Sequence, residues 1–478
     1  MNVSKAFLVF LTLLGCTSCV QPVGFQSSGI ETPEAWHTFE RLPGDPMLWD
    51  NPLVVDDCAE VEQRWWHHFD DCVLDTLITR ALLNNKTLGI ASTRIEEARA
   101  ARLGAFSVLM PQINLNTDAQ RGNQGLFTGD RPLAYEDVNI QANWELDLFG
   151  KNQARMAATI ALVQNEEILR QGVIVSLLAE VARGYYDFRN YQDQITISEK
   201  NLETQKRTLE LTIAQFQEAY ASDFDVQRAA AQVASTEARI PTLKIALETT
   251  RNRLDVLLGS TPGENDDLFA TYEPLMPLDP QIIIAAPATV LGTRPDVRAA
   301  ERELAASIST FEAAKKEWFP TISLAAFFGF QALQGFNQET TGLQHLIRTW
   351  NVAGTLVQPL IDFGRIEADI ETADARQQRA FLEYQETVLE AFENMENALA
   401  NYLYETIRNV SLTSAATHNH KALELANQQY TNGYTNLLDV LVVQRNALEA
   451  ESAAAESTYK LRKDLVNIYT AAGGGWAL

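Results

Sequence analysis

The sequence contains few of the residues that catalytic and metal-binding sites use. Among 478 residues there are four Cys, six His and six Met. Apart from Cys16 and Cys19 at the end of the N-terminal apolar segment, no Cys-x-x-Cys pair occurs. The Met residues are scattered and His67-His68 stands alone, so neither a metal site nor a soft-metal relay is indicated. No nucleophile elbow and no phosphate-binding loop is present. The sequence therefore predicts a protein without a cofactor that is not an enzyme.

Positive charge is also scarce. The formal net charge is −24. Because DNA and RNA are bound through basic surfaces, this charge argues against nucleic acid as a partner. It suits an acidic surface or channel lumen that faces water or cations.

A long hydrophobic run is missing at the N-terminus. Lys5 precedes the apolar run Ala6–Leu14, which is shorter than the roughly 20 residues of a membrane-spanning helix. We interpret residues 1–15 as a secretion signal. Leu13-Leu14-Gly15-Cys16 resembles a bacterial lipobox, which predicts cleavage before Cys16 and a covalent lipid on that residue. A signal with a stray cysteine, and lipidation at Cys19, are the alternatives.

Two further cysteines are present, Cys58 and Cys72. In an oxidising periplasm they could form a disulfide. Two buried free thiols are the alternative, and the sequence leaves both open.

Short segments with a period of two indicate β-strands. Residues 113–120 and 138–148 alternate apolar with polar side chains. Residues 121–135 between them are predicted to form a loop. Residues 321–331 and 350–362 repeat the pattern, and the last strand is expected to stop near Gln358-Pro359. The polar face of the second segment is expected to line a pore through Asn139, Gln141, Asn143, Glu145 and Asp147.

The strands have the length and pattern of a transmembrane β-barrel. A soluble β-sandwich is the alternative, but four strands are too few for one and their apolar faces carry large residues such as Trp144, Phe328, Phe330 and Trp350. Four strands cannot close a barrel, and open edges are not tolerated in lipid. Three copies would supply twelve strands. We therefore predict a mixed α/β membrane protein that forms a homotrimer in contact with outer-membrane lipid. Trp144 and Trp350 are candidates for an interfacial belt or for ordinary lipid contact.

Proline is scarce in the long helical stretches. After Lys151 the next proline is Pro241, and none follows Gly364. Stretches of 65–70 residues would reach roughly 100 Å as helices, and their apolar residues recur at spacings of three and four. A helix is also predicted from Leu74 to about Ser107, whereas residues 20–60 are expected to form an extended tether.

The chain is an internal repeat. An offset of 214 residues places Phe149 on Phe363 and Asp225 on Asp439, and an offset of 209 places Pro111 on Pro320. Each half reads as a helix, a strand pair and a long helical hairpin.

The hairpin turns are the candidate gate. Gly433 is expected to end one helix, and the pairs Ser222/Asp225 and Asn436/Asp439 have capping-box spacing. We hypothesise that Asp439, with Asp225 and Tyr430, lines a constriction where copies meet. The alternative is that both aspartates only cap helices.

Several motifs then match a known family. They are Arg294–Glu301 (RPDVRAAE), Phe319–Leu324 (FPTISL), Trp65-Trp66 with Phe69, Leu74–Leu77, the Asp-Phe-Gly turn, and the tip residues Tyr430, Gly433 and Leu438–Val440. Nearly all of the mature chain resembles the TolC/OprM outer-membrane efflux channels, most closely their lipoprotein (NodT-type) branch. The first repeat departs from the pattern, with Asn84-Asn85-Lys86 in place of Arg294-Pro295 and Ala219 in place of Gly433.

The resemblance implies a trimer with one 12-stranded barrel that continues as a helical coiled-coil tunnel in the periplasm. A periplasmic adaptor and an inner-membrane RND-type pump would open its tip, and the chain would be a passive duct for drugs and other toxic small molecules. A duct for protein secretion and a heavy-metal efflux duct share the fold, and a lipid-anchored coiled-coil scaffold is the non-transport alternative.

The predicted segments follow from the motifs and the repeat. They are a signal peptide (1–15), a lipidated tether with an equatorial segment (16–73), a first efflux repeat (74–259), an inter-repeat linker (260–293), a second efflux repeat (294–473) and a tail (474–478).

Overall fold

A computed structural model describes residues 29–41, 53–56, 59–122, 133–270, 275, 282–334 and 347–477. These residues form two compact units. Apart from the gaps just given, the sheet unit contains Thr93–Glu167 and Ala299–Gln385, and the helical unit contains Gly29–Ser92, Ile168–Arg298 and Glu386–Leu478.

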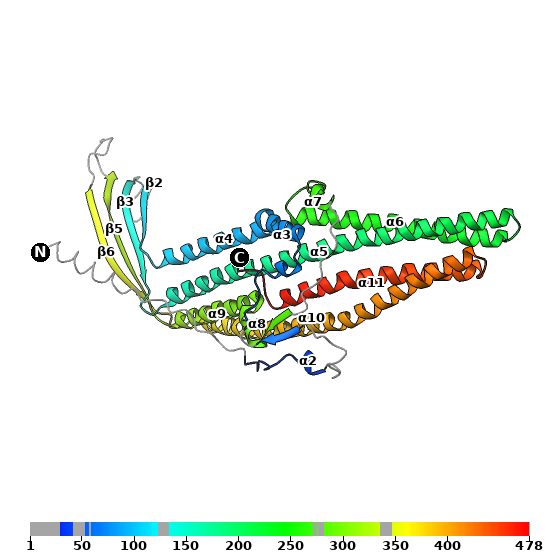
Figure 1. Cartoon of the computed structure of the whole chain (residues 1–478). Coiled ribbons are helices and arrows are strands. Elements are labelled where there is room, and N and C mark those ends of the chain that lie inside the picture. Colours follow the sequence, from blue (N-terminus) through cyan, green and yellow to red (C-terminus); the bar gives the residue numbers. More distant parts are fainter. Residues whose placement is uncertain are drawn as a thin grey trace. The chain divides into compact units, whose positions relative to one another are not determined.

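The described elements repeat in order along the chain (Figure 1). They are α2 (His37–Arg41), β1 (Leu53–Asp56), the 3-10 helix η1 (Trp65–Phe69), α3 (Cys72–Asn84), α4 (Lys86–Val108), β2 (Gln112–Gly122), β3 (Leu133–Leu146), α5 (Lys151–Gln217), α6 (Asp223–Leu257), α7 (Asp266–Ala270), β4 (Ile282–Ala285), α8 (Pro287–Thr293), α9 (Pro295–Lys315), the 3-10 helix η2 (Lys316–Trp318), β5 (Thr321–Gln334), β6 (Ile347–Val357), α10 (Arg365–Thr431) and α11 (Leu437–Ala471).

The sheet unit contains one antiparallel sheet in the order β2-β3-β5-β6 (Figure 1). The predicted alternation is confirmed, and β6 ends before Gln358-Pro359 as expected. β2 reaches Gly122 and β3 starts at Leu133, so the predicted loop of residues 121–135 was too long. Both β2 and β6 lie at sheet edges.

The two faces of the sheet differ in chemistry. One face carries large apolar side chains that are exposed to solvent in the single chain. They are Ile113, Leu115, Val138, Ile140, Phe328, Phe330, Trp350, Val352 and Leu356. An exposed apolar face of this size is typical of a surface that meets lipid or protein.

The long helices have the predicted length. α5 and α10 contain 67 residues each, and α6 and α11 contain 35 residues each. At 1.5 Å per residue, 67 residues extend roughly 100 Å. Among the helices in the described ranges, none is long and apolar enough to cross a membrane.

The predicted helix from Leu74 to Ser107 is wrong in one respect, because it is broken into α3 and α4. Asn85 has an extended backbone (φ −61°, ψ 128°). Its side-chain Nδ2 donates to the Leu257 carbonyl at 2.9 Å, and its Oδ1 accepts from Leu88 N at 3.0 Å. Asn therefore caps α4 and holds the end of α6, and the hydrophobic pattern could not show this.

The tether prediction is also wrong for part of its length. In the helical unit, β1 pairs in parallel with β4, and Trp36 is buried with its Nε1 donating to the Ala285 carbonyl at 3.2 Å. The Glu396 carboxylate accepts from the backbone N of His37 (2.7 Å) and Thr38 (2.9 Å). Two strands of four residues, separated by more than 220 positions, have too little pattern to be paired from sequence.

Candidate functional site

The polar face of the sheet is the first candidate site. Asn139, Gln141 and Asn143 lie on one face of β3, as predicted, and Asn116 on β2 lies opposite Asn139. Asn116 Nδ2 donates to Gln141 Oε1 at 2.8 Å, and Gln141 Nε2 donates to Asn143 Oδ1 at 3.4 Å. The face is therefore a ladder of amide groups, which have the chemistry to exchange hydrogen bonds with water or polar solutes.

Phe327 is a functional candidate that the sequence reasoning missed. The strand register places it between Gln141 on β3 and Asn351 on β6, on the polar face. At Gly329, two residues along the strand, an added Cβ would lie 2.5 Å from Asn139 Cβ, so the neighbouring strand leaves no space for a side chain there. The sequence contains a signal for this. Phe328 and Phe330 occupy the apolar face of the alternating pattern, so Phe327 must lie on the opposite, polar face.

One residue that was predicted to line the pore lies beyond the end of β3. Glu145 is on the strand and forms an ion pair with Lys151 at 3.2 Å. Asp147 lies beyond the last residue of β3, and its Oδ2 accepts from Gln153 N at 2.7 Å. Asp147 therefore caps the start of α5 and does not belong to the polar face of the sheet, although the alternation continues through it.

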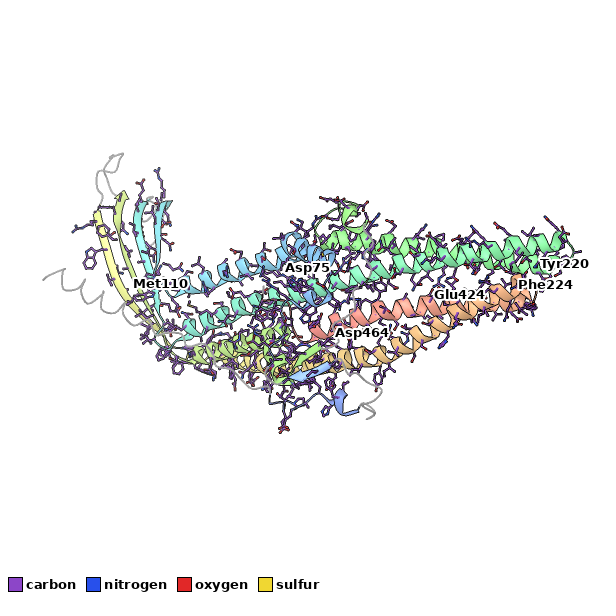
Figure 2. All side chains as sticks on the ribbon, in the orientation of Figure 1. Asp75, Met110, Tyr220, Phe224, Glu424 and Asp464 are labelled. Carbon is purple, nitrogen blue, oxygen red and sulfur yellow. The ribbon has the colours of Figure 1, made fainter. Side chains whose placement is uncertain are left out.

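The two hairpin tips have the same backbone design. At the end of α10, Tyr434 N donates to Gln429 O (2.8 Å) and Gly433, at φ +75°, donates to Tyr430 O (3.0 Å). At the end of α5, Tyr220 and Ala219 make the equivalent bonds, and Ala219 adopts φ +60°. This is the Schellman ending that Gly favours, here with Ala in the first repeat. Figure 2 shows Tyr220 at the α5–α6 turn, where it is 86% exposed.

The predicted capping box is complete in the first repeat. Asp225 N donates to Ser222 Oγ at 3.2 Å, and Ser222 N donates to Asp225 Oδ2 at 3.1 Å. The bonds from Ser222 lower the pKa of the Asp225 carboxyl.

In the second repeat, one of the two hydrogen bonds of the capping box is replaced by another contact. Asp439 N donates to Asn436 Oδ1 at 2.9 Å, whereas the Asp439 carboxylate accepts from the Thr435 hydroxyl at 3.1 Å. The Asp439 side chain is exposed and does not make the Asn436 cap.

Tyr430 was predicted to line the constriction, but in the structure its side chain is buried between helices. Its ring is buried against Ala229, Leu437 and Val440. Its hydroxyl donates to Gln215 Oε1 at 2.8 Å and lies 3.2 Å from Thr212 Oγ1. Tyr430 therefore joins α10 to α5 near the tip. Of the three residues in the gate hypothesis, Asp439 is exposed and Asp225 is half-buried.

The Arg-Pro-Asp motif is structural. Arg294 is buried, and its NH1 donates to the Ala471 carbonyl at 2.6 Å. Its Nε and NH2 make a bidentate pair with Asp296 at 3.1 and 2.6 Å. The motif fastens the start of α9 to the end of α11.

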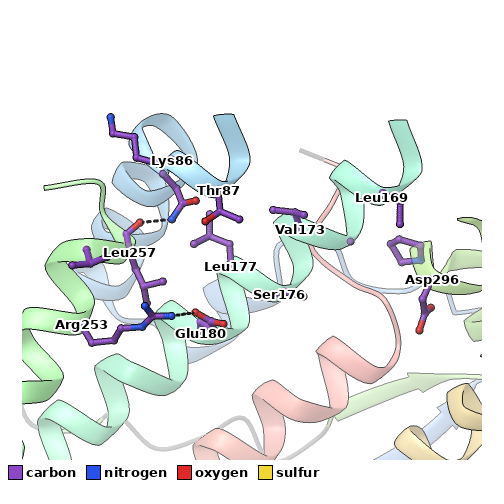
Figure 3. Close-up of a pocket in the computed structure, with 14 residues that line it drawn as sticks. Lys86, Thr87, Leu169, Val173, Ser176, Leu177, Glu180, Arg253, Leu257 and Asp296 are labelled. Atoms are coloured by element: carbon purple, nitrogen blue, oxygen red, sulfur yellow. Dashed lines mark hydrogen bonds and ion pairs between the residues drawn. The ribbon is translucent and has the colours of Figure 1, made fainter. Parts of the chain in front are cut away.

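A pocket of about 520 Å³ lies in the helical unit (Figure 3). α5 forms its floor through Leu169, Val173 and Leu177, with Lys86 on one side and Asp296 on the other. Arg253 and Glu180 form an ion pair at 3.0 Å at its rim. Throughout the described ranges, no group of three or more His, Cys, Asp or Glu side chains is placed to hold a metal ion.

The cysteine predictions remain predictions. Cys72 is an exposed free thiol at the start of α3. Cys58, Cys16 and Cys19 lie outside the described residues.

Comparison with known proteins gives consistent matches. The profile of the family described as outer membrane efflux protein matches residues 77–260 and 286–474. Nodulation protein T of Rhizobium leguminosarum is 27% identical, covering 86% of this chain and 84% of its own. The pyoverdine export outer membrane protein OpmQ of Pseudomonas putida is 27% identical, covering 96% of this chain and 97% of its own. The solved structure of the outer-membrane channel OprN has a TM-score of 0.83 and 31% identity, covering 96% of this chain and 100% of that one.

Proposed function

The chain belongs to the outer membrane efflux protein family and is an outer-membrane efflux channel, and we propose that it works as the passive exit duct of a tripartite pump. The observation that carries this proposal is the four-stranded sheet, with one exposed apolar face, one amide-lined face and two open edges. Such a sheet can face lipid on one side and a water-filled lumen on the other once its edges are paired.

We infer that three copies complete the barrel. Because the sheet has an even number of antiparallel strands, β6 of one copy can pair antiparallel with β2 of the next. Three copies give twelve strands, and the long helices of the three copies would form the periplasmic tunnel.

A periplasmic adaptor and an RND-type inner-membrane pump are the proposed partners. The exposed turns at Tyr220 and Tyr434 end the two helical hairpins and are available to an adaptor. A lipid on Cys16 would anchor the chain beside the barrel and adds to membrane binding without replacing the barrel.

Asp439 is the proposed gate residue, with Asp225 in a supporting position. Three copies of an exposed carboxylate near one axis repel one another and attract cations. The Asp439 side chain is suited to this role because Asn436 supplies the helix cap independently. The Asp225 carboxylate and backbone N are both held in its capping box, so we assign Asp225 only a supporting position in the gate.

The proposed cargo is small organic molecules. OpmQ, a relative at 27% identity, is named for pyoverdine export. The amide ladder and Phe327 form a surface that suits neutral polar and aromatic solutes more than soft metal ions.

The test compares a deletion strain with its complemented parent. Retention of a lipophilic dye, retention of a siderophore, sensitivity to copper and the secreted protein profile are measured in parallel. We expect the deletion to raise retention of the dye or the siderophore while copper sensitivity and secretion stay unchanged. A change confined to copper or to secreted protein would assign one of the alternative ducts, and no change in any arm would contradict the efflux function.

A further inference from the structure

Two carboxylates lie opposite each other on the polar face of the sheet. Asp118 on β2 and Asp137 on β3 are partners in the strand register. They share the face of Asn139, because residues two apart on a strand point the same way. Side chains directly opposite on antiparallel strands have Cβ atoms about 4.5–5.5 Å apart, and like charges there repel. The pair is therefore unfavourable unless a positive charge lies close to it.

The basic side chains of the sheet do not supply that charge. The sequences of β2, β3, β5 and β6 contain no Lys, and their two Arg are Arg121 and Arg348. Arg121 is three residues from Asp118 on β2, and Arg348 is the register partner of Phe330. Both arginines therefore lie on the apolar face, and the polar face of these four strands carries no side-chain cation.

Asp137 has one carboxylate oxygen that is held and one that is free. The residue is 4% exposed, and its Oδ2 accepts from Asn139 Nδ2. Asn139 is oriented in turn by Asn116, whose Nδ2 donates to Asn139 Oδ1 at 3.4 Å. Within the described residues, no group donates to Asp137 Oδ1, which is buried. A buried acceptor without a partner is costly. The amide ladder thus ends on a carboxylate that has a free oxygen beside Asp118.

We propose that Asp118 and Asp137 bind a hard divalent cation, with Ca²⁺ as the best fit. The side chains available are carboxylates and amides, and oxygen ligands of this kind suit Ca²⁺ and not soft metal ions. Ca²⁺ bonds oxygen at about 2.3–2.6 Å, so one ion can bridge two carboxylates about 5 Å apart. Because Asp118 is exposed, water can complete the irregular coordination that Ca²⁺ accepts.

The ligand set also sets the expected strength of binding. The site has two acidic side chains, fewer than the three or more that a typical protein metal site would gather. Its remaining ligands are amide oxygens and water. Sites with few charged ligands bind Ca²⁺ with dissociation constants on the order of 10⁻⁴–10⁻³ M. The site would therefore respond to millimolar Ca²⁺.

The site lies at the hairpin end of the strands. β2 follows α4 and β3 leads into α5, so Asp118 and Asp137 are at the end of each strand that is farther from these helices. The inference rests on the proposed duct for the water-filled lumen that the polar face lines. It adds a cation site that is separate from the proposed gate at Asp439. Bound ions would offset negative charge near the outer mouth of the duct.

A thermal titration of the full-length protein in detergent tests the site. An Asp439→Asn background removes the gate carboxylate from the measurement. The unfolding temperature is followed as CaCl₂ is added, with NaCl of equal ionic strength as the reference. A ligand that binds the folded protein raises this temperature as its concentration passes the dissociation constant. We expect a rise that saturates in the millimolar range. Adding Asp137→Asn should abolish the rise, and adding Asp118→Asn should shift it to higher Ca²⁺.

Glu136→Gln is the matched control. Glu136 is the neighbour of Asp137 on β3, and its register partner is Ala119, so its carboxylate lies on the other face of the same strand. This substitution removes one charge and should keep the full response to Ca²⁺. An unchanged response in Asp137→Asn, or an equal loss in Glu136→Gln, would overturn the proposal. If Asp137→Asn does not fold, Asp118→Asn decides, because its side chain is exposed: an unchanged response there also overturns the proposal.

The site and the duct can fail separately. Single-channel recordings in the presence of a calcium chelator test the duct without the bound ion. Current steps in these recordings, together with a Ca²⁺ response that does not depend on Asp118 or Asp137, would contradict the cation site and leave the duct standing. A protein that never gives current steps would contradict the duct itself.

Discussion

At the scale of single residues, the structure of the two hairpin turns distinguishes helix capping from channel gating. Helix capping and channel gating were both assigned to the aspartates at positions 225 and 439. The structure shows that Asp225 shares its carboxylate with the Ser222 cap, whereas the cap at Asn436 uses the backbone N of Asp439. The two roles can therefore be tested with different substitutions.

Replacing Asp439 with Asn should change the channel without changing the fold. The substitution removes the carboxylate charge but keeps the backbone bond to Asn436. We expect weaker block by divalent cations in single-channel recordings and an unchanged unfolding midpoint. Asn436→Ala is the matched control: it should cost about 1 kcal/mol of stability and leave cation block unchanged. Identical cation block in wild type and Asp439→Asn would show that Asp439 does not gate.

Replacing Ala219 with glycine should stabilise the first helical hairpin. It adopts φ +60° at the position where the second repeat has Gly433, and a left-handed residue with a Cβ costs roughly 1–2 kcal/mol. Ala219→Gly should therefore stabilise the hairpin by about 1 kcal/mol, and Gly433→Ala should destabilise it by a similar amount, as measured by denaturant unfolding. Opposite signs for the two substitutions are the result that supports the account, and equal signs contradict it.

At the scale of elements, the sequence was sufficient where a pattern repeats over many residues. The period of two located β2, β3, β5 and β6, and the absence of proline located α5 and α10. Prediction failed where one side chain decides the outcome, as at Asn85, which breaks a helix by bonding to Leu257. It also failed at Asp147, because the alternation of apolar and polar residues does not reveal where the hydrogen bonds between neighbouring strands end.

Phe327 should narrow the channel from the polar face of its strand. Phe327→Ala removes a ring that lies between Gln141 and Asn351, so we expect a higher single-channel conductance. Phe328→Ala removes the same volume from the apolar face and is the matched control, with conductance unchanged. Equal effects of the two substitutions would contradict the assignment of the faces.

The second hairpin should be sensitive to pH through His420. Its Nδ1 lies 2.8 Å from Glu451 Oε1, which joins α10 to α11, and Nε2 lies 3.4 Å from Glu424 Oε1. The hydrogen bond to Glu451 raises the pKa of His420 above its usual 6.5. The ion pair thus stabilises the hairpin fully below pH 6.5 and is lost as pH rises through the folded-state pKa. The unfolding midpoint of wild type should exceed that of His420→Gln in acid and approach it in base. A difference that is constant with pH would rule this out.

At the scale of the whole molecule, the proposed function follows from surfaces that a single chain leaves uncovered. One chain contains four strands with two open edges and an exposed apolar sheet face. Each feature is unfavourable in an isolated chain, and each is removed when identical copies meet side by side in a membrane. The repeat in the sequence predicted that two halves would look alike. Only the structure shows which of the equivalent surfaces are covered.

The most direct test is the single-channel conductance of the purified full-length protein in planar lipid bilayers. The account predicts discrete current steps that need no nucleotide or other energy source and that change with Phe327→Ala but not with Phe328→Ala. A protein that inserts or binds at the bilayer and never produces current steps would contradict the claim that this chain forms an outer-membrane duct.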